Sequence, residues 1–347
     1  MRTERHDVEK SLKNLESMGV DRRTALKVMA AAGLGWAAGS LMPTGGPRMA
    51  RAAEDTIAVR MPTLIAGSTS MINTVISDKG FDKQNGLRID YSKRSSIPAY
   101  YADFRVGRFD AIVGGVGNAM KERAAGADST IFATQSPTAA FFLTRNPALT
   151  GIEGLRGKKI AAPVGSGNFL VARATAGLYG IDLQKDAELI NVKGPGGGPT
   201  QLAAGRVDVA FSWEPAVSIF LSKNPDARIM VNVREAYRRK TGKDSHVIVL
   251  YAHEAFLKKH PEVVPRLIKT YQEAGNYFKT NLDAALEVVA KKTGKGTGPI
   301  KAAFLAGRVG YSTKPAHEER DMLTTLMQAL VKIGFVKDIP PGIIYQS

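Results

Sequence analysis

The sequence contains no cysteine, and this absence excludes several classes of protein. A chain without thiols cannot be a disulfide scaffold, a thiol enzyme or a lipoprotein that is anchored through cysteine. Histidine is also scarce, with five residues, at positions 6, 246, 253, 260 and 317. No metal-ligand spacing between one of them and another histidine or a carboxylate stands out. We therefore expect neither a metal site nor a cofactor.

Long apolar runs are also rare, and the one notable run lies near the start of the chain, from Val28 to Met42. It is too short and too rich in glycine for a membrane span of about 20 apolar residues. The paired arginines Arg22 and Arg23 precede it, and an A-x-A site at residues 50–52 follows it. This arrangement resembles a twin-arginine export signal. We expect residues 1–53 to be this signal and the mature protein to be soluble in the periplasm; an ordinary secretory signal or a single anchoring helix are the alternatives.

Basic residues outnumber acidic ones, with 48 Lys and Arg against 32 Asp and Glu and a formal net charge of +16. Such a balance can indicate nucleic acid, an anionic membrane surface or acidic small molecules as partners. The basic residues are scattered, however, and the densest clusters are only residues 238–240 and 291–292. We interpret these short runs as solvated helix faces, so we expect a monomer that binds a small molecule and no nucleic acid.

Apolar, β-rich runs alternate with helical stretches through most of the chain, and this rhythm predicts βαβ units with a mostly parallel sheet. The expected strands lie at residues 56–61, 87–91, 109–113, 130–133 and 140–144, and then at 159–162, 188–192, 207–211 and 246–251. C-terminal to these strands, the periodicity of the apolar residues predicts a series of amphipathic helices. These helices are expected at residues 262–279, 282–292, 300–306 and 316–333.

One phrase occurs twice, as GRFDAIVGGVGN at residues 107–118 and as GRVDVAFSWEPA at residues 205–216. The glycine that opens each copy suits the left-handed conformation that ends a helix. Asp110 and Asp208 then stand at the entry of a strand, where a carboxylate can bond to nearby backbone groups. Because both copies occupy equivalent places in the βα rhythm, the repeat predicts two similar α/β lobes.

We place the boundary between the lobes where the alternation of predicted strands and helices begins again. We expect residues 54–145 and 246–347 to form the first lobe and residues 146–245 the second. The chain would then cross between the lobes near Arg145 and again near residues 244–246. The C-terminal helices are expected to pack back on the first lobe.

The stretch DKGFDKQNGL at residues 78–87 resembles the E-K-G-F-F-x-x-x-G-L signature of the nitrate/sulfonate/taurine group of periplasmic solute-binding proteins, which serve ABC importers. Asp82 stands where the signature has its second phenylalanine. Residues 155–161 and the Trp-Glu-Pro at residues 213–215 also resemble that family, in the same order along the chain. The resemblance implies a two-lobed, periplasmic-binding-protein-like type II fold with two hinge crossings and a helical C-terminal segment. It also implies capture of a nitrate-, sulfonate- or taurine-like solute for an ABC permease.

The ligand site can also be placed on physical grounds. In open α/β sheets ligands lie beyond the carboxyl ends of the strands, where helix N-termini favour anions. The candidate residues follow predicted strands and carry small polar groups, a bare backbone, an indole or a carboxylate: Thr63, Ser68, Thr69, Gly117, Asn118, Ser136, Thr138, Ser166, Asn168, Trp213 and Glu214. Several of these residue types also serve as plain helix N-caps. Trp213 can stack on a ligand or pack under the edge of its lobe. Glu214 can accept from a ligand donor, pair with a base across the cleft, or only stabilise a helix N-terminus.

No ordered Ser/His/Asp arrangement stands out, so we predict no catalytic residues. Some enzymes of vitamin and quinone biosynthesis share the two-lobed fold, and such an enzyme is one alternative. A sensory module that presents its ligand to a membrane receptor is another. Both would use the same lobes, and the sequence leaves the identity of the ligand open.

Overall fold

The structure is a computed structural model, and it describes residues 56–65, 67–294 and 296–346. The predicted export signal at residues 1–53, with Arg22 and Arg23, lies outside these residues. Within the described part of the chain, no helix is both long and apolar enough to cross a membrane.

The first half of the fold is built on strands that carry the N-terminal βα units. Strands β1 (Ile57–Leu64) and β2 (Leu87–Arg94) pair in parallel. Beside them lies a sheet in the order β11 (Lys314–Pro315), β4 (Ser129–Ser136), β10 (Ile248–His253) and β3 (Ala111–Gly115). The amide of Asp110 donates to the Arg60 carbonyl over 2.9 Å, which joins β3 to β1 and makes one continuous layer.

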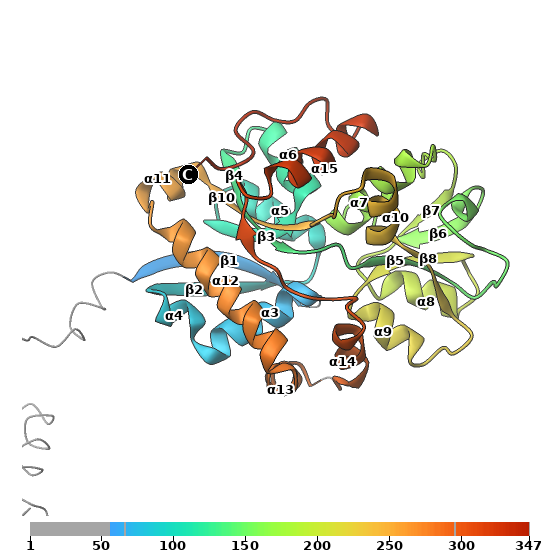
Figure 1. Cartoon of the computed structure of the whole chain (residues 1–347), viewed down its shortest axis with the longest axis horizontal. Helices are drawn as coiled ribbons and strands as arrows, with labels where there is room; N and C mark the ends of the chain where they lie inside the picture. The colour runs from blue at the N-terminus through green and yellow to red at the C-terminus, as the bar shows by residue number, and fades with distance from the viewer. Residues whose placement is uncertain (1–55, 66, 295, 347) are drawn as a thin grey trace, which may run out of the picture. The chain divides into compact units, whose positions relative to one another are not determined.

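Helices cover this layer on both sides (Figure 1). In chain order they are α3 (Ser68–Lys79), α4 (Phe81–Gln84), α5 (Ile97–Arg105), α6 (Val116–Ala124), α11 (Glu254–Lys259), α12 (Val263–Thr280) and α13 (Leu282–Thr293). Helix α3 ends where the sequence supplies Gly80, whose φ of 68° closes the helix in the left-handed conformation.

The second half has its own sheet, in the order β7 (Glu188–Asn191), β6 (Lys159–Ala162), β8 (Val209–Trp213), β5 (Ala140–Thr144) and β9 (Arg228–Asn232). Its helical segments are η1 (Glu153–Leu155), α7 (Gly167–Leu178), α8 (Gly197–Ala203), α9 (Ala216–Leu221) and α10 (Val233–Thr241). Two sheets with separate sets of helices agree with the two-lobed architecture that the repeat predicts.

Most strands of each half run in the same direction, as the sequence predicts, and one long strand in each half runs against its neighbours. Strand β5 runs antiparallel to β8 and β9, and β10 runs antiparallel to β3 and β4. The reason is that these two strands follow the crossings, so each enters its sheet from the opposite lobe. Because β5 already belongs to the second sheet, the first crossing lies at residues 137–139 and not near Arg145. The second crossing, just before β10 begins at Ile248, lies where it was expected.

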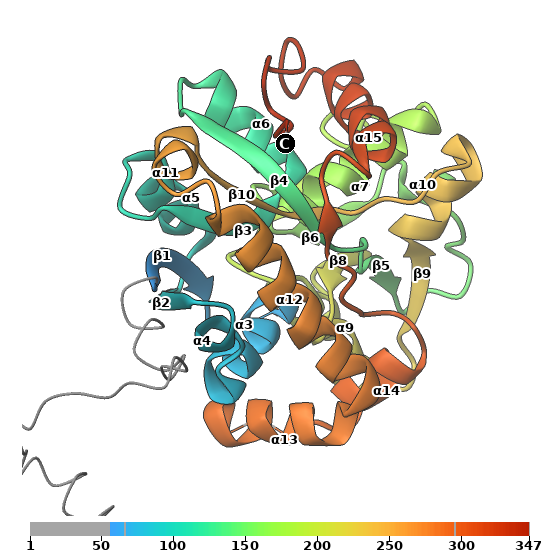
Figure 2. The ribbon, with the colours of Figure 1, turned by 60° about the vertical axis from the view of Figure 1, so that its left-hand side comes forward.

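The C-terminal helices only partly follow the expectation that they pack on the first lobe. Helices α12 and α13 do pack on α3. Helix α14 (Gly298–Leu305), however, packs on α9 of the second half, and α15 (Arg320–Lys332) packs on both α6 and α7. Figure 2 shows α13 and α14 together at the foot of the molecule and α15 beside α7. The C-terminal segment therefore contacts both halves.

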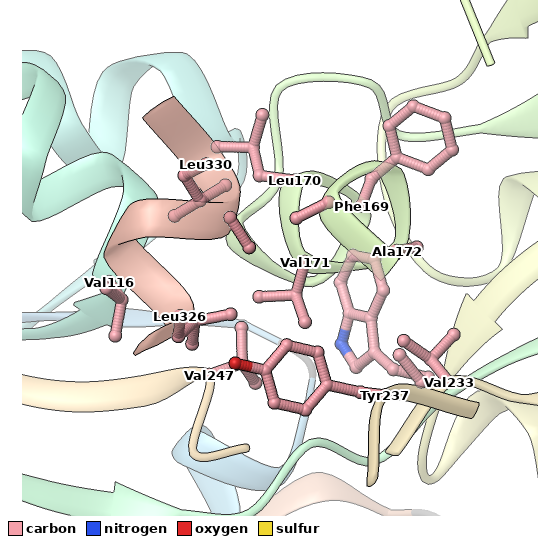
Figure 3. Packing of buried hydrophobic residues seen from close by; sticks show 14 of the residues in the cluster. Val116, Phe169, Leu170, Val171, Ala172, Val233, Tyr237, Val247, Leu326 and Leu330 are labelled. Carbon is pink, nitrogen blue, oxygen red and sulfur yellow. The ribbon is translucent and has the colours of Figure 1, made fainter. Parts of the chain in front are cut away.

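One apolar core runs without interruption from the first half into the second. Its buried residues come from α5, β3 and α6 as well as from β6, α7, β8 and α10. Figure 3 shows Leu326 and Leu330 of α15 between Val116 of α6 and the α7 residues Leu170 and Val171. Burial of side chains from both halves in a single cluster holds α6, α7 and α15 together.

The duplicated phrase is the same structural unit in both halves, as predicted. Gly107 and Gly205 have φ values of 74° and 66° and end α5 and α8 in the left-handed conformation. The Asp110 carboxylate accepts from the Arg60 amide over 2.8 Å, and the Asp208 carboxylate accepts from the Lys159 amide over 2.9 Å. The aspartate thus joins the start of β3 to β1 in the first half and the start of β8 to β6 in the second.

We predict that Asp208→Ala lowers the free energy of unfolding by about 1 kcal/mol, because the Lys159 amide loses its acceptor. Chemical denaturation measures the change. Asp90→Ala is the control, because Asp90 forms only an exposed ion pair with Arg88. Its loss should cost less than about 0.5 kcal/mol. Equal effects of the two substitutions would contradict a structural role for the repeated aspartate.

Candidate functional site

A cavity of about 460 Å³ lies between the two halves of the fold. Its walls come from the β1–α3 turn and α13 on one side and from α8 and α9 on the other, with α14 between them. The lining residues are Ile65, Gly67, Ser70, Met71, Pro195, Gly196, Pro199, Thr200, Ala203, Pro215, Ala216, Ile219, Phe220, Lys223, Asn224, Val289, Thr293 and Ile300. The volume is in the range of small-molecule sites.

Three helices begin at this cavity, one from the first half and two from the second. The N-cap residues of α3, α8 and α9 are Gly67, Gly196 and Pro215, and all three line the cavity. Among the described residues, no side chain of these N-cap positions caps its helix. The first amides of a helix have no partner within the helix, and the helix dipole adds partial positive charge there. The starts of α3 and α8, one from each half, therefore favour an anion in the cavity, whereas at α9 the Glu214 carboxylate already accepts from a first-turn amide.

Glu214 lies just behind the α9 start and is already engaged. Its side chain is fully buried, and its Oε2 accepts from the Ser218 amide over 3.0 Å. Its Oε1 accepts from the Ser218 hydroxyl over 2.8 Å and from Nε of Arg308 over 3.0 Å. Arg308 lies in the segment that links α14 to β11, so this carboxylate pairs with a base from outside its own sheet.

Trp213 is the last residue of β8, and its side chain is only 7% exposed. It packs in the continuous core, with its ring centre 6.4 Å from that of Phe211. A Cβ on Gly67 would lie 3.7 Å from the indole Nε1. The indole thus packs under the lobe edge and turns its nitrogen toward a glycine that lines the cavity.

The starts of α6 and α7 meet each other instead of opening onto the cavity. A Cβ built on Gly115 would lie 2.6 Å from the Gly167 Cα, and one on Gly167 would lie 2.7 Å from the Gly115 Cα. The Asn118 amide donates to the Gly165 carbonyl over 3.4 Å across this contact. Burial raises the pKa of the Tyr101 phenol to about 12, so its neutral hydroxyl can accept from the Gly115 amide over 3.2 Å.

Four predicted site residues belong to this contact between the halves. Gly117, Asn118, Ser166 and Asn168 are all buried on α6 and at the start of α7. Ser166 caps α7, accepting from the Phe169 amide over 3.2 Å. Plain N-capping, the alternative role, is wrong for Thr69, Asn118 and Asn168. The N-cap residues of α3, α6 and α7 are Gly67, Gly115 and Ser166.

The remaining predicted residues have partners within the protein. The Thr63 hydroxyl accepts from the Asn73 amide over 3.1 Å, and the Ser68 carbonyl accepts from the Tyr311 hydroxyl over 2.6 Å. The Ser136 hydroxyl bonds the side chain of its neighbour Gln135. Thr138 lies in the first crossing, where its amide and hydroxyl both donate to the Ser245 carbonyl of the second crossing, over 2.8 and 3.1 Å. It ties the two crossings together.

The lining residues are instead sequence neighbours of the predicted ones. For some of them the sequence indicated a position at the cleft. Ser68 and Thr69 flank Gly67 and Ser70, and Glu214 flanks Pro215. The GPGGGPT stretch at residues 194–200 supplies four lining residues. The glycines and prolines of this stretch predict a turn that could form a wall of the cleft. Nothing in the sequence of α13 and α14 indicated that these helices would line the site.

We predict that Gly167→Ala forces the starts of α6 and α7 apart by about 1 Å, because a Cβ cannot approach the facing backbone so closely. The expected result is a loss of about 1–3 kcal/mol in the free energy of unfolding and faster hydrogen exchange at the first amides of both helices. Gly165→Ala is the matched control, since no atom of the described residues lies within 4 Å of its added Cβ. Equal stability of the two variants would argue against a tight glycine contact.

We also predict that Arg308→Met destabilises the fold by about 2–3 kcal/mol, because it leaves the buried Glu214 carboxylate without its cation. The double variant Glu214→Gln, Arg308→Met should regain part of this loss in a double-mutant cycle. Arg206→Met is the control, because Arg206 is exposed and lies in the same half as Glu214. It should change the free energy of unfolding by less than about 0.5 kcal/mol. If the stability losses from Glu214→Gln and Arg308→Met are additive, the two side chains are not energetically coupled and the predicted pair is contradicted.

Comparison with solved structures shows that two sulfonate-binding proteins have a similar fold. The alkanesulfonate-binding protein SsuA of Xanthomonas axonopodis pv. citri, bound to MOPS, superimposes with a TM-score of 0.69 at 16% identity, over 84% of this chain and 99% of that protein. The periplasmic aliphatic sulphonate binding protein SsuA of Escherichia coli gives 0.66 at 19% identity, over 83% and 95%. The predicted periplasmic-binding-protein-like fold is confirmed.

Similarity in sequence points the same way. A Brucella abortus (strain 2308) protein that is named as a binding protein is 24% identical over 240 residues, which are 69% of this chain and 73% of that protein. An aliphatic sulfonates-binding protein of Bacillus subtilis (strain 168) is 25% identical over 214 residues, or 61% of each chain. The NMT1/THI5-like family model matches residues 70–285, which is more than half of the chain. This protein therefore belongs to the NMT1/THI5-like family.

Proposed function

We propose that this protein is the substrate-binding component of an ABC importer and captures a small anionic or zwitterionic solute between its two lobes. The observation that carries the proposal is the cavity between the halves, onto which the starts of α3 and α8 open, one from each half. Amides from both halves would then bind the same ligand. The similarity to sulfonate-binding proteins supports a solute of this kind.

Binding would stabilise the closed arrangement of the lobes. Opening would have to separate the Gly115–Gly167 contact together with the part of the core that α6, α7 and α15 share. The bonds between Thr138 and Ser245 would persist, because they join the two crossings where the lobes hinge. A ligand that contacts both lobes binds the closed form better and so increases its population. The permease would recognise that form.

We further propose that the protein acts in the periplasm after export. The paired Arg22 and Arg23 and the apolar run that follows support a twin-arginine signal. The related Escherichia coli protein is described as periplasmic. A monomer without nucleic-acid partners agrees with the scattered distribution of the basic residues.

The alternatives are an enzyme with this fold and a sensory module. The similarity to substrate-binding proteins favours a non-enzyme. Turnover of a bound solute would indicate an enzyme, and transfer of the liganded protein to a membrane receptor instead of a permease would indicate a sensor.

We expect small organic anions to raise the Tm of the purified protein and to change the fluorescence of Trp213, whose indole lies beside Gly67 of the cavity wall. The measurement uses a Trp36→Phe variant so that Trp213 is the sole tryptophan. The panel contains nitrate, sulfonates, taurine and aromatic carboxylates. If no member of this panel changes either signal, the proposal of an anion receptor fails.

A further inference from the structure

The chain connects its two halves at a further place, between the end of α14 and the start of β11. Helix α14 packs on α9 of the second half, whereas β11 pairs with β4 of the first sheet. Residues 306–313 therefore lead from the second half back to the first, and Figure 1 shows this segment, in orange-red, running from α14 toward the first sheet. It lies beside the first crossing at residues 137–139, because the Ser312 amide donates to the Gln135 carbonyl over 3.0 Å.

Arg308 attaches this segment to the second half. Its Nε donates to Oε1 of Glu214 over 3.0 Å, and its Nη2 donates to the Ser218 hydroxyl over 2.9 Å. Glu214 is fully buried and directly precedes the cavity residue Pro215. Because the loss of its cation leaves a buried carboxylate strongly destabilised, Arg308 has to move together with the start of α9.

Tyr311 attaches the same segment to the first half. Its hydroxyl donates over 2.6 Å to the carbonyl of Ser68, the first residue of α3 and the neighbour of the cavity residue Gly67. Its ring packs against Phe278 of α12, with 4.9 Å between the ring centres. A Cβ on Gly275 of α12 would lie 3.1 Å from the Tyr311 Cβ, so the helix and the segment are in close contact. Tyr311 thus holds the start of α3.

The two attachment points lie close together along the chain. A chain extends by at most about 3.6 Å per residue, so the Cα atoms of Arg308 and Tyr311 can be no more than about 11 Å apart. While both contacts hold, this length limits how far the start of α9 can move from the start of α3. Gly310 lies between the two, and an added Cβ there would meet no described atom within 4 Å. Because glycine has wide conformational freedom, the link can bend at this residue.

We propose that residues 308–311 form a third hinge strand, that this strand limits how far the two walls of the cavity can separate, and that Arg308 and Tyr311 are positioning residues for those walls. The crossings at residues 137–139 and before Ile248 connect the two sheets. The third strand connects instead the helix starts beside the cavity. For ligand binding the inference rests on the proposed function, but the spacing of the walls can be measured without a ligand.

The absence of cysteine allows a distance measurement on the full chain. Ser77→Cys and Ser222→Cys place one spin label on α3 and one directly after α9, at two exposed positions. Insertion of one glycine between Val309 and Gly310 lengthens the third strand by about 3.3 Å and leaves both attachment points in place. We expect the mean distance between the labels to increase by about 3 Å, because the limit on the separation of the walls is relaxed.

Insertion of one glycine after Gly126, in the turn between α6 and β4, is the matched control. This turn lies within the first half, and a Cβ on Gly126 would meet no described atom within 4 Å. The control should leave the distance between the labels unchanged. Circular dichroism and thermal unfolding establish that both proteins are folded. Equal distances in the two insertion variants would overturn the third hinge strand.

Tyr311→Phe tests the same inference without a change in chain length, since it keeps the ring and removes only the donor to Ser68. Tyr179→Phe is its control, because the Tyr179 hydroxyl donates to the Ala236 carbonyl over 2.9 Å within the second half. We expect hydrogen exchange in the first two turns of α3 to become about fivefold faster in Tyr311→Phe, as the loss of one hydrogen bond predicts, and to be unchanged in Tyr179→Phe. Equal exchange of α3 in the two variants would contradict the role of Tyr311.

Calorimetry with ethanesulfonate measures the consequence for ligand binding. We expect the insertion after Val309 to weaken the affinity at least about threefold relative to the insertion after Gly126, because the two walls are no longer held at a fixed spacing before the ligand binds. If both insertion variants bind ethanesulfonate equally, the third strand does not position the site and the inference fails. If the unaltered protein binds no member of the anion panel, the proposed function fails, and the label distances and exchange rates still decide the third hinge strand.

Discussion

The close approach of two glycines determines how the halves of this protein fit together. Gly115 and Gly167 stand where α6 and α7 begin, and neither position has room for a Cβ. Their contact lets the two helices meet end to end, so that α15 can pack across both and one apolar core can continue from one half to the other. With the lobes at this distance, the remaining space between them is the cavity at α3, α8 and α9.

The cavity combines two properties that the fold supplies separately. Helix starts provide unpaired amides and partial positive charge, while the side chains of α9, α13 and α14 provide an apolar wall. Glu214, the carboxylate directly before the α9 start, is paired with Arg308 and so faces a cation of the protein and not the solute.

Much of the fold could be predicted because the sequence repeats its local chemistry. The repeated sequence at residues 107–118 and 205–216 marks a helix end and a strand entry, and both copies form the predicted unit with its aspartate bonded to the neighbouring strand. Strand β9 was not predicted, α10 was indicated only by its basic run at residues 238–240, and the first crossing was placed too late. These features break the βα rhythm, and no local pattern tells whether a strand such as β5 stays in the first sheet or enters the second.

The candidate site shows the same limit. The sequence by itself determined the family resemblance, the two-lobed architecture and the neighbourhood of the site, because these depend on local turns, caps and strand periodicity. Only the tertiary structure decided which helix starts face the cavity, as Gly67 and Pro215 do, and which are used up in contact between the halves, as Asn118 is. It also placed α14 on α9 and Arg308 on Glu214. These are contacts between residues about 90 positions apart, and their partners are chosen by packing that no local pattern encodes.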